Sequence, residues 1–168
     1  MEIEKKYRVK RMPENLEQYC CKKIEQGYLC KSPVIRIRRS NEDYILTYKS
    51  KMALKDGSRI QETEARMCEE VEVPLSKEGY LHLKEKVDGR IINKRRYQIP
   101  YQERLIELDV FEGFLEGLVF AEVEFENEAQ AKEFVPPEWF GEEVTFDYRF
   151  SNNYLAHDYE GTYSEDPF

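Results

Sequence analysis

The chain has 168 residues, a length that suits one domain with one substantial core or one closed barrel. Hydrophobic residues make up 40% of the chain and aromatic residues 13%, a composition that argues against disorder. The formal net charge of −8 argues against general nucleic-acid binding. The N-terminal residues MEIEKKYRV contain no apolar leader, and no apolar run approaches membrane-spanning length. We therefore expect a cytoplasmic protein with no membrane or nucleic-acid partner.

The chain begins with an alternating segment, residues 2–9, which predicts a β-strand. On a strand, Glu2, Glu4 and Lys6 share one face. Two carboxylates side by side on a pleat repel each other. That face therefore needs water, a metal ion or facing cations to neutralise it.

Further alternating segments follow in chain order. Residues 14–23 are expected to form a turn or short helix, and a strand is expected to begin near Gln26. Alternation then predicts strands at 34–38, 44–50, 61–66, 92–97, 105–111 and 119–125. Helices are predicted at 77–87, after the N-cap Ser76, and at 128–134, where Asn127 and Gln130 resemble a capping box. A last helix is predicted at 144–156 and a loose tail at 159–168.

Like-charged side chains recur two positions apart on these strands. The acidic pairs are Glu2/Glu4, Glu62/Glu64, Glu107/Asp109 and Glu122/Glu124, and the basic pairs are Arg36/Arg38 and Lys94/Arg96, with Lys6 and Lys49 beside them. A half-buried sheet with one solvated face would explain any single pair. Exposed faces usually mix signs, whereas here the signs are segregated by strand, and roughly eight strands are enough to close a barrel.

We therefore predict a barrel whose charged faces point inward and whose apolar outer faces are covered by helices. Acidic strands in such an interior could hold a divalent metal ion through hard oxygen ligands. Basic strands could hold a polyanion, because arginine makes forked contacts with phosphate oxygens.

Taken in order, the same residues resemble the CYTH superfamily, also called triphosphate tunnel metalloenzymes. Its N-terminal signature E-x-E-x-K is matched by Glu2, Glu4 and Lys6. The later matches run in order through Gln26-Gly27-Tyr28, Arg36-Ile37-Arg38, Leu46-Thr47-Tyr48-Lys49, Glu62-Thr63-Glu64, Lys94-x-Arg96-Tyr97, Glu107-Leu108-Asp109-Val110-Phe111 and Glu122-Val123-Glu124-Phe125. The chain looks most similar to the short bacterial tripolyphosphatase type.

The resemblance implies an α+β fold: an eight-stranded antiparallel β-barrel with helices packed outside and a C-terminal helix near the tunnel mouth. It implies a single domain over residues 1–158, followed by a C-terminal tail, 159–168. The implied activity is hydrolysis of inorganic triphosphate to pyrophosphate and phosphate with Mg²⁺ or Mn²⁺. A class IV-type adenylate cyclase, a thiamine or nucleoside triphosphatase, and a non-catalytic polyphosphate-binding module remain alternatives. Whether the chain forms a homodimer is left open.

The resemblance also implies roles for individual residues. The implied metal ligands are Glu2, Glu4, Glu62, Glu64, Asp109, Glu122 and Glu124. The implied triphosphate-binding residues are Lys6, Arg36, Arg38, Lys49, Lys94, Arg96 and Arg149. Tyr28 beside Lys6 is a candidate general-base dyad, because a nearby ammonium stabilises tyrosinate. An ordinary strand aromatic is the alternative for Tyr28.

Three positions depart from the pattern of the short members. Ile60 stands where these members often carry an arginine, two residues before the first acidic residue of the 62/64 pair. Tyr148 and Phe150 stand where the last helix often carries lysine and tyrosine. These changes bear on how the site closes and on the chain length of the preferred substrate.

Overall fold

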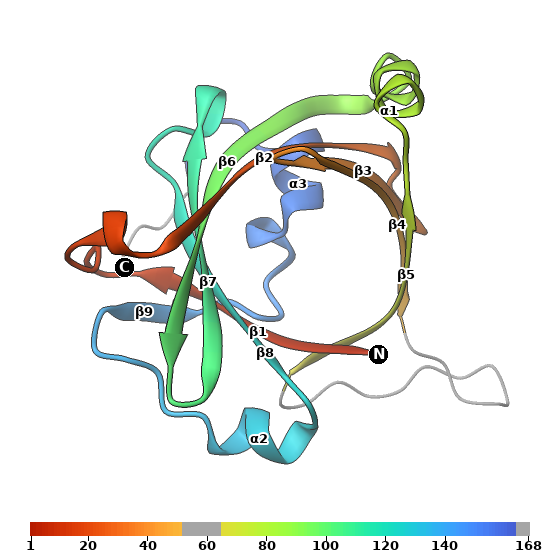
Figure 1. Cartoon of the computed structure of the whole chain (residues 1–168). Coiled ribbons are helices and arrows are strands. Elements are labelled where there is room, and N and C mark those ends of the chain that lie inside the picture. The colour runs from red at the N-terminus through yellow and green to blue at the C-terminus, as the bar shows by residue number, and fades with distance from the viewer. Residues whose placement is uncertain (52–64, 164–168) are drawn as a thin grey trace, which may run out of the picture.

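The computed structural model describes residues 1–51 and 65–163, and Figure 1 shows them as a ring of strands. The strands hydrogen-bond in the order β5-β4-β3-β2-β6-β7-β8-β1, and an additional β5–β1 pairing closes the ring. All these pairings are antiparallel. A further strand, β9, pairs with β1 beside the ring. The predicted eight-stranded antiparallel barrel is therefore confirmed.

The barrel strands are β1 (Glu2–Val9), β2 (Cys20–Cys30), β3 (Val34–Ser40), β4 (Asp43–Lys51), β5 (Arg66–Pro74), β6 (Asp88–Tyr101), β7 (Arg104–Glu112) and β8 (Val119–Phe125). The remaining elements are β9 (Phe140–Glu143), the helices α1 (Lys77–Lys84), α2 (Glu128–Glu133) and α3 (Asn152–His157), and the 3₁₀ turns η1 (Leu16–Gln18), η2 (Gly113–Leu115) and η3 (Tyr148–Phe150). The bounds of β1 and β8 are those predicted from alternation. None of the described helices is long and apolar enough to cross a membrane.

The helix starts also agree with the sequence, because side-chain caps mark them. The Ser76 hydroxyl accepts a hydrogen bond from the Gly79 N–H at 3.0 Å and begins α1. The Asn127 side chain accepts from the Gln130 N–H at 2.9 Å and begins α2. Both caps satisfy backbone donors that a helix cannot satisfy internally.

The predicted last helix at 144–156 is wrong. The Asp147 side chain accepts from the Arg149 N–H, and the Ser151 side chain accepts from the Tyr154 N–H. Each cap begins a separate short element, so the segment divides into η3 and α3 with an extended residue, Ser151, between them. The strand predicted at 61–66 lies outside the described residues up to position 64, and the described strand β5 begins at Arg66.

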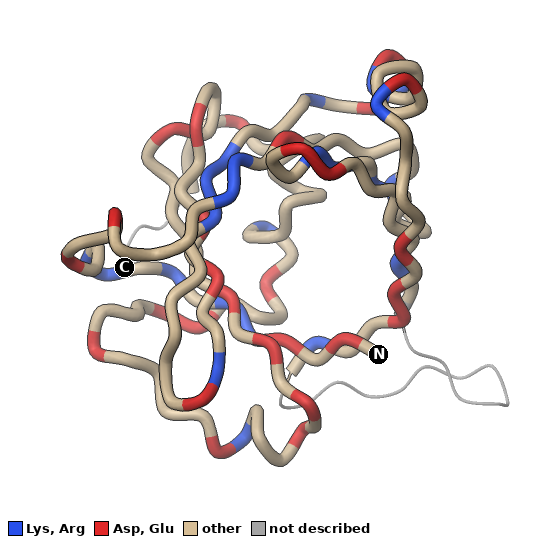
Figure 2. The backbone as a smooth tube through the Cα atoms, viewed as in Figure 1, with Lys and Arg blue, Asp and Glu red and all other residues tan. Residues whose placement is uncertain are grey.

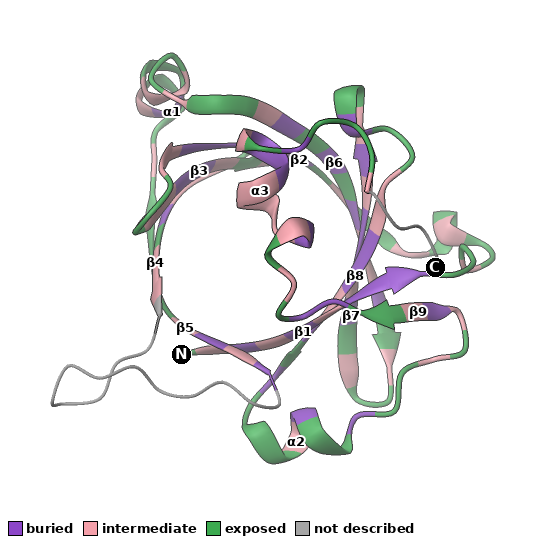
Figure 3. Ribbon diagram, turned by 180° about the vertical axis from the view of Figure 1, so that it is seen from behind, coloured by how far each residue is buried: buried purple, intermediate pink, exposed green. Residues whose placement is uncertain are grey.

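One hydrophobic cluster covers part of the outer surface of the barrel. Outward-facing side chains such as Ile3, Leu108 and Val123 pack there with Phe134 after α2 and Phe140 of β9. In Figure 3 the buried positions of β1, β8 and β9 are coloured purple. This wall matches the prediction that helices cover the apolar outer faces.

The prediction fails on another wall of the barrel. On β4 and β5, Tyr48 and Val71 lie directly opposite each other, with 39% and 56% of their surfaces exposed. Within the described part of the chain, α1 contacts β3 and β4, but these two side chains stay open to solvent. The outer face is therefore covered on one side and solvated on the other.

A second hydrophobic cluster fills one end of the barrel interior. Phe111 and Phe120 lie two positions along their strands from Asp109 and Glu122, so they share the inward face. They pack with Phe150 of η3, whose ring meets Phe120 edge to face at 5.7 Å. The segment that carries η3 and α3 lies across this end of the ring in Figure 1.

The described part of the predicted tail belongs to the same cluster. Tyr159 is buried, and the Tyr163 ring stacks on Phe150 with 4.4 Å between the ring centroids. The Tyr163 hydroxyl also donates to the Arg149 carbonyl at 3.1 Å. Residues 159–163 are therefore packed rather than loose. The division of the chain at residue 158 stays a prediction.

The outer cluster generates a direct test on one strand. Leu108 of β7 is fully buried, whereas Leu105 of the same strand is 43% exposed. We expect Leu108→Ala to lower the free energy of unfolding by about 2–5 kcal/mol, because it removes buried methyl groups and leaves a cavity. Leu105→Ala, the matched control, should cost less than about 1 kcal/mol. Urea unfolding measures both variants, and equal losses would contradict the assignment of this core.

Candidate functional site

A charged cavity lies inside the barrel. The cations that line it are Lys6, Arg36, Arg38, Lys49, Arg66 and Arg96, and the carboxylates are Glu2, Glu4, Glu70, Glu107 and Glu122. Its neutral lining consists of Tyr28, Val34, Ser151, Asn152 and Asn153. Acidic and basic positions lie along the strands around the ring in Figure 2. The strand pleat aims alternate side chains inward, so the predicted charged interior is confirmed.

Most residues that the sequence nominated for a site meet in this cavity. They are Glu2, Glu4, Lys6, Tyr28, Arg36, Arg38, Lys49, Arg96 and Glu122. Their strands lie on opposite sides of the ring, since β1 and β8 face β3 and β4 across it (Figure 1). Residues far apart in sequence are thereby brought to one enclosed space.

Other nominated residues lie elsewhere. Lys94 and Asp109 are buried but do not line the cavity. Glu124 is exposed and lines a separate surface hollow with Glu103 and Glu126.

The three remaining predicted site residues are Arg149, Glu62 and Glu64. Arg149 pairs with Asp147, with 2.7 Å between Nη2 and Oδ2, and is not among the lining residues. Glu62 and Glu64 lie outside the described residues, as does Ile60.

Three charged lining residues were not assigned a role from the sequence. Arg66 and Glu70 come from β5, and Glu107 comes from β7. The signal for the first two is present: Arg66, Glu70 and Glu72 alternate in a run that ends at Pro74.

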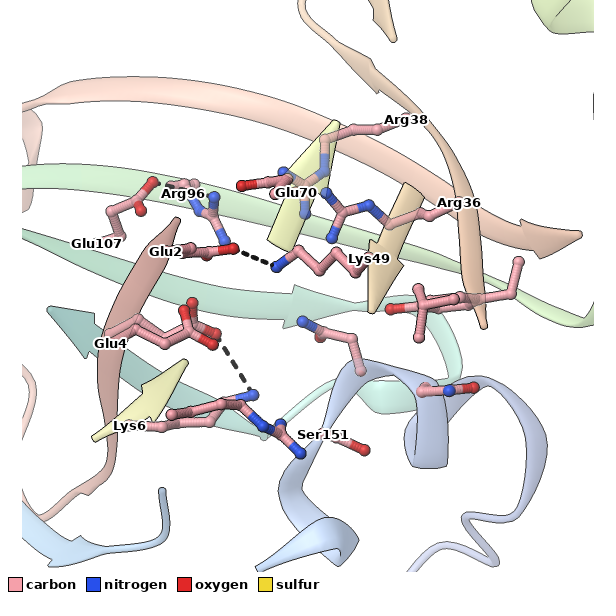
Figure 4. Close-up of a pocket in the computed structure, with 16 residues that line it drawn as sticks. Glu2, Glu4, Lys6, Arg36, Arg38, Lys49, Glu70, Arg96, Glu107 and Ser151 are labelled. Atoms are coloured by element: carbon pink, nitrogen blue, oxygen red, sulfur yellow. Dashed lines mark ion pairs between the residues drawn. The ribbon is translucent and has the colours of Figure 1, made fainter. Parts of the chain in front are cut away.

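Ion pairs join residues that line the cavity, and dashed lines mark them in Figure 4. Lys49 Nζ lies 2.8 Å from Glu2 Oε2. Lys6 Nζ lies 3.4 Å from Glu122 Oε1 and donates to the Phe150 carbonyl at 2.7 Å. Burial alone would raise the pKa of Glu2, but Lys49 lowers it below its ordinary value. Burial opposes ionisation of Glu122 in the same way, and Lys6 with Arg96 lowers its pKa to about 2.

Glu4 and Glu70 are less well compensated. Burial raises the pKa of Glu4 to about 8, and the neighbouring Glu122 carboxylate adds to the effect. Burial also raises the pKa of Glu70 to about 7, although Lys49 opposes the shift. Crowded carboxylates of this kind are stabilised in their charged form by any cation that reaches them.

The carboxylates fit a hard divalent cation in a particular way. Within residues 1–51 and 65–163, no group of three acidic, histidine or cysteine side chains is arranged to hold a metal ion by itself. A magnesium-type ion needs no such cage, because one or two carboxylates usually hold it together with phosphate oxygens and water. Glu4, with Glu2 or Glu70, supplies oxygen ligands of the right kind, and the raised pKa of Glu4 means that the lining cations only partly compensate the charge of its ionised form.

Tyr28 and Lys6 both line the cavity, but in the described part of the chain no hydrogen bond joins them. Tyr28 is 3% exposed, and its ring lies 5.8 Å from that of His157 in α3. The proposed Lys6–Tyr28 dyad stays a prediction.

Beside the cavity, Asp109 holds two cations. Asp109 Oδ2 lies 2.7 Å from Lys94 Nζ, and its two oxygens accept from Arg96 Nε at 2.7 Å and Nη2 at 2.9 Å. Lys94 is 0% exposed and Asp109 is 2% exposed. Burial alone would raise the pKa of Asp109, but Arg96 and Lys94 hold it far below its ordinary value. Asp109, predicted as a metal ligand, is therefore engaged as an internal counter-ion.

Comparison with known proteins agrees with this geometry. The family model described as CYTH domain matches residues 1–151. An inorganic triphosphatase of Nitrosomonas europaea is 36% identical over 92% of this chain and 96% of its own length. An inorganic triphosphatase of Acetivibrio thermocellus is 32% identical over 78% of each chain. A solved inorganic triphosphatase structure has a TM-score of 0.65 and 34% identity, covering 93% of this chain and 94% of its own.

The Asp109 cluster generates a prediction. We expect Asp109→Asn to lower the free energy of unfolding by about 3–5 kcal/mol, because it leaves buried cations without their counter-ion. Adding Lys94→Met should restore at least roughly half of that loss, since the second variant removes one of the uncompensated charges. Urea unfolding of the metal-free protein measures both effects.

The same variants separate a counter-ion from a metal ligand. A counter-ion variant loses stability but keeps its affinity for Mn²⁺, measured by titration calorimetry on the folded protein. A loss of Mn²⁺ affinity at unchanged stability would instead identify Asp109 as a ligand.

Proposed function

The chain belongs to the CYTH domain family, and from this premise we propose that it hydrolyses inorganic triphosphate to pyrophosphate and phosphate with a divalent metal ion. The observation that carries the proposal is the single enclosed cavity in which cations from β1, β3, β4, β5 and β6 face carboxylates from β1, β5, β7 and β8. A polyanion needs the cations, and a metal ion bound to that polyanion needs the carboxylates. Binding a polyanion alone would not require both.

Substrate binding is the role of the basic lining. We assign the phosphate oxygens to Lys6, Arg36, Arg38, Lys49, Arg66 and Arg96. Arginine suits this task because its planar fork matches phosphate geometry, whereas lysine supplies a compact charge. Lys94 acts through Asp109 and Arg96 rather than by contact with the substrate.

The acidic lining holds the metal ion. We assign Glu4 as a ligand, with Glu2 and Glu70 beside it, and expect Mg²⁺ or Mn²⁺, because both accept carboxylate oxygens. When bound, the ion neutralises charge on the phosphate oxygens and lowers the pKa of coordinated water. Glu2 also pairs with Lys49, with 2.8 Å between Oε2 and Nζ, and both side chains line the cavity.

Hydrolysis requires a water in line with the phosphorus–oxygen bond that breaks. The water oxygen attacks the terminal phosphorus, and pyrophosphate leaves with the bonding electrons. Lys6 is placed to stabilise the charge of the terminal phosphate, since its ammonium lies in the cavity between Glu122 and the Phe150 carbonyl. We keep Tyr28 with Lys6 as the proposed dyad that accepts the proton of the water.

The end of the cavity next to η3 and α3 limits the length of the substrate. Ser151, Asn152 and Asn153 line it with neutral side chains, and the hydrophobic cluster around Phe150 lies behind them. Tyr148 is 68% exposed and Phe150 is buried in that cluster, so neither departure from the family pattern supplies a charge to the cavity. We propose that this end receives a terminal phosphate and excludes a longer chain.

We also propose a cytoplasmic location. The supporting observation is that Cys20, Cys21, Cys30 and Cys68 are all free thiols, which is the usual state in a reducing compartment.

The proposal predicts phosphate release from tripolyphosphate in the presence of Mg²⁺ or Mn²⁺ and none in EDTA. Phosphate, pyrophosphate and cyclic AMP are measured with tripolyphosphate, ATP and thiamine triphosphate as substrates. Cyclic AMP from ATP would support a cyclase instead. Tight tripolyphosphate binding without turnover of any substrate would support a non-catalytic binding module.

A variant separates catalysis from binding. We expect Glu4→Gln to lower kcat at least about a hundredfold, because it removes a carboxylate that holds the metal ion. Its affinity for tripolyphosphate in EDTA should be unchanged or higher, since a negative charge has left the cavity. Glu17→Gln removes the same charge from the exposed turn η1 and is the control. Unchanged turnover in Glu4→Gln would contradict the assigned role.

A further inference from the structure

Three arginines of the cavity are held by three different kinds of acceptor. Carboxylates hold Arg96, which pairs with Asp109 and, at 3.0 Å, with Glu107. A hydroxyl holds Arg36, whose Nη2 donates to Thr47 Oγ1 at 3.3 Å. A neutral amide holds Arg38, whose Nε and Nη2 both donate to Gln26 Oε1, at 2.9 and 2.8 Å. The difference determines how much positive charge each guanidinium presents to the cavity.

Gln26 is placed for this contact by the sheet. It lies directly opposite Arg38 in the β2–β3 register, and the next inward pair is Tyr28 opposite Arg36. Gln26 is 0% exposed, and among the described residues its Nε2 group has no hydrogen-bond partner. A buried amide with an unsatisfied donor costs stability, and the two hydrogen bonds that Gln26 Oε1 accepts from Arg38 offset part of that cost.

The neighbouring glycine keeps this pair in position. Gly27 faces outward, where an added Cβ would lie 2.8 Å from the Val87 side chain and 2.9 Å from Ile91. Val87, in the connection after α1, and Ile91, near the start of β6, therefore pack directly against the β2 backbone at Gly27. In the Gln26-Gly27-Tyr28 motif, the glycine therefore packs on the outside of the barrel, and the Gln26 amide and the Tyr28 phenol on either side of it point inward.

The neutral acceptor adds no negative charge, so the charge of Arg38 is only partly compensated, by the Asp109 carboxylate. Burial lowers the pKa of Arg38, and Arg36 with Arg96 lowers it further. The charged guanidinium is therefore electrostatically unfavourable in the empty cavity, and an anion that enters relieves it. A carboxylate in the place of the amide would relieve it permanently and would leave less attraction for a ligand.

We propose that Gln26 is a positioning residue that fixes the Arg38 guanidinium in the cavity while leaving its charge available to the phosphate groups of the substrate. The inference rests on the proposed triphosphate site and adds to it a reason for the neutral acceptor. Arg38 and Arg36 are then the main anion-binding pair, whereas Arg96 is largely neutralised by Asp109 and Glu107. Gln26 itself does not line the cavity.

The test replaces Gln26 with residues of the same length. Gln26→Glu keeps the acceptor and adds a charge, whereas Gln26→Met removes the acceptor. Gln18→Glu adds the same charge on the exposed turn η1 and is the matched control. Titration calorimetry with inorganic tripolyphosphate in EDTA measures affinity without turnover, and thermal unfolding without ligand measures Tm.

For Gln26→Glu we expect opposite movements of the two quantities. Tripolyphosphate affinity should fall at least about tenfold, because an internal ion pair neutralises Arg38, while Tm rises. With metal ion present, KM should rise by a similar factor and kcat should change less than about threefold, since the lost interaction is made equally in the bound and transition states. Gln26→Met should lower both affinity and Tm, and Gln18→Glu should change neither.

Two results would overturn the inference. One is an unchanged tripolyphosphate affinity in Gln26→Glu, and the other is a loss of affinity in Gln26→Glu that accompanies a loss of Tm in that variant, which would make Gln26 a packing residue. Failure of the proposed function is recognised separately, because it appears as absence of turnover in the unsubstituted protein. The calorimetric comparison in EDTA does not depend on that turnover.

Discussion

Charge enclosed in a closed barrel is the constraint on which the rest of the structure depends. A buried charge is costly unless a partner neutralises it, and the interior of this barrel holds cations and carboxylates in close quarters. These charges differ in how fully their neighbours compensate them. Lys94, Asp109 and Arg96 neutralise one another beside the cavity, whereas the charged forms of Glu4 and Arg38 are only partly compensated by their neighbours. Ligands of both signs can therefore be attracted to one space.

Hydrophobic packing makes that arrangement possible by holding the ring closed around it. The outer cluster under α2 and β9 supports β1, β7 and β8, which carry most of the acidic lining. The inner cluster around Phe120 and Phe150 fills one end of the barrel and brings the Phe150 carbonyl to Lys6. Because η3 and α3 begin at separate caps, Ser151 and the asparagines after it face the charged cavity from the apolar end.

Alternation along the chain explains which strand faces and site residues could be predicted from the sequence. That Glu2, Glu4 and Lys6 share one face follows from the strand period alone, and the closed barrel turns that face inward. Family resemblance added order and function, and its prediction for Glu62 and Glu64 lies outside the described residues. Glu70, which the resemblance did not single out, is the β5 carboxylate that the described part of the chain places in the cavity.

The sequence by itself determined the strands and which charged side chains share a face, because strand periodicity and charge sign are local properties of the chain, and the family resemblance added the closed barrel. Only the tertiary structure decided how each charge is used. Asp109 binds Arg96, and Gln26 accepts hydrogen bonds from Arg38, because these partners lie on neighbouring strands. The physical reason is that ionisation depends on burial and on charges a few ångströms away. Those distances arise only when the strands have paired and the barrel has closed.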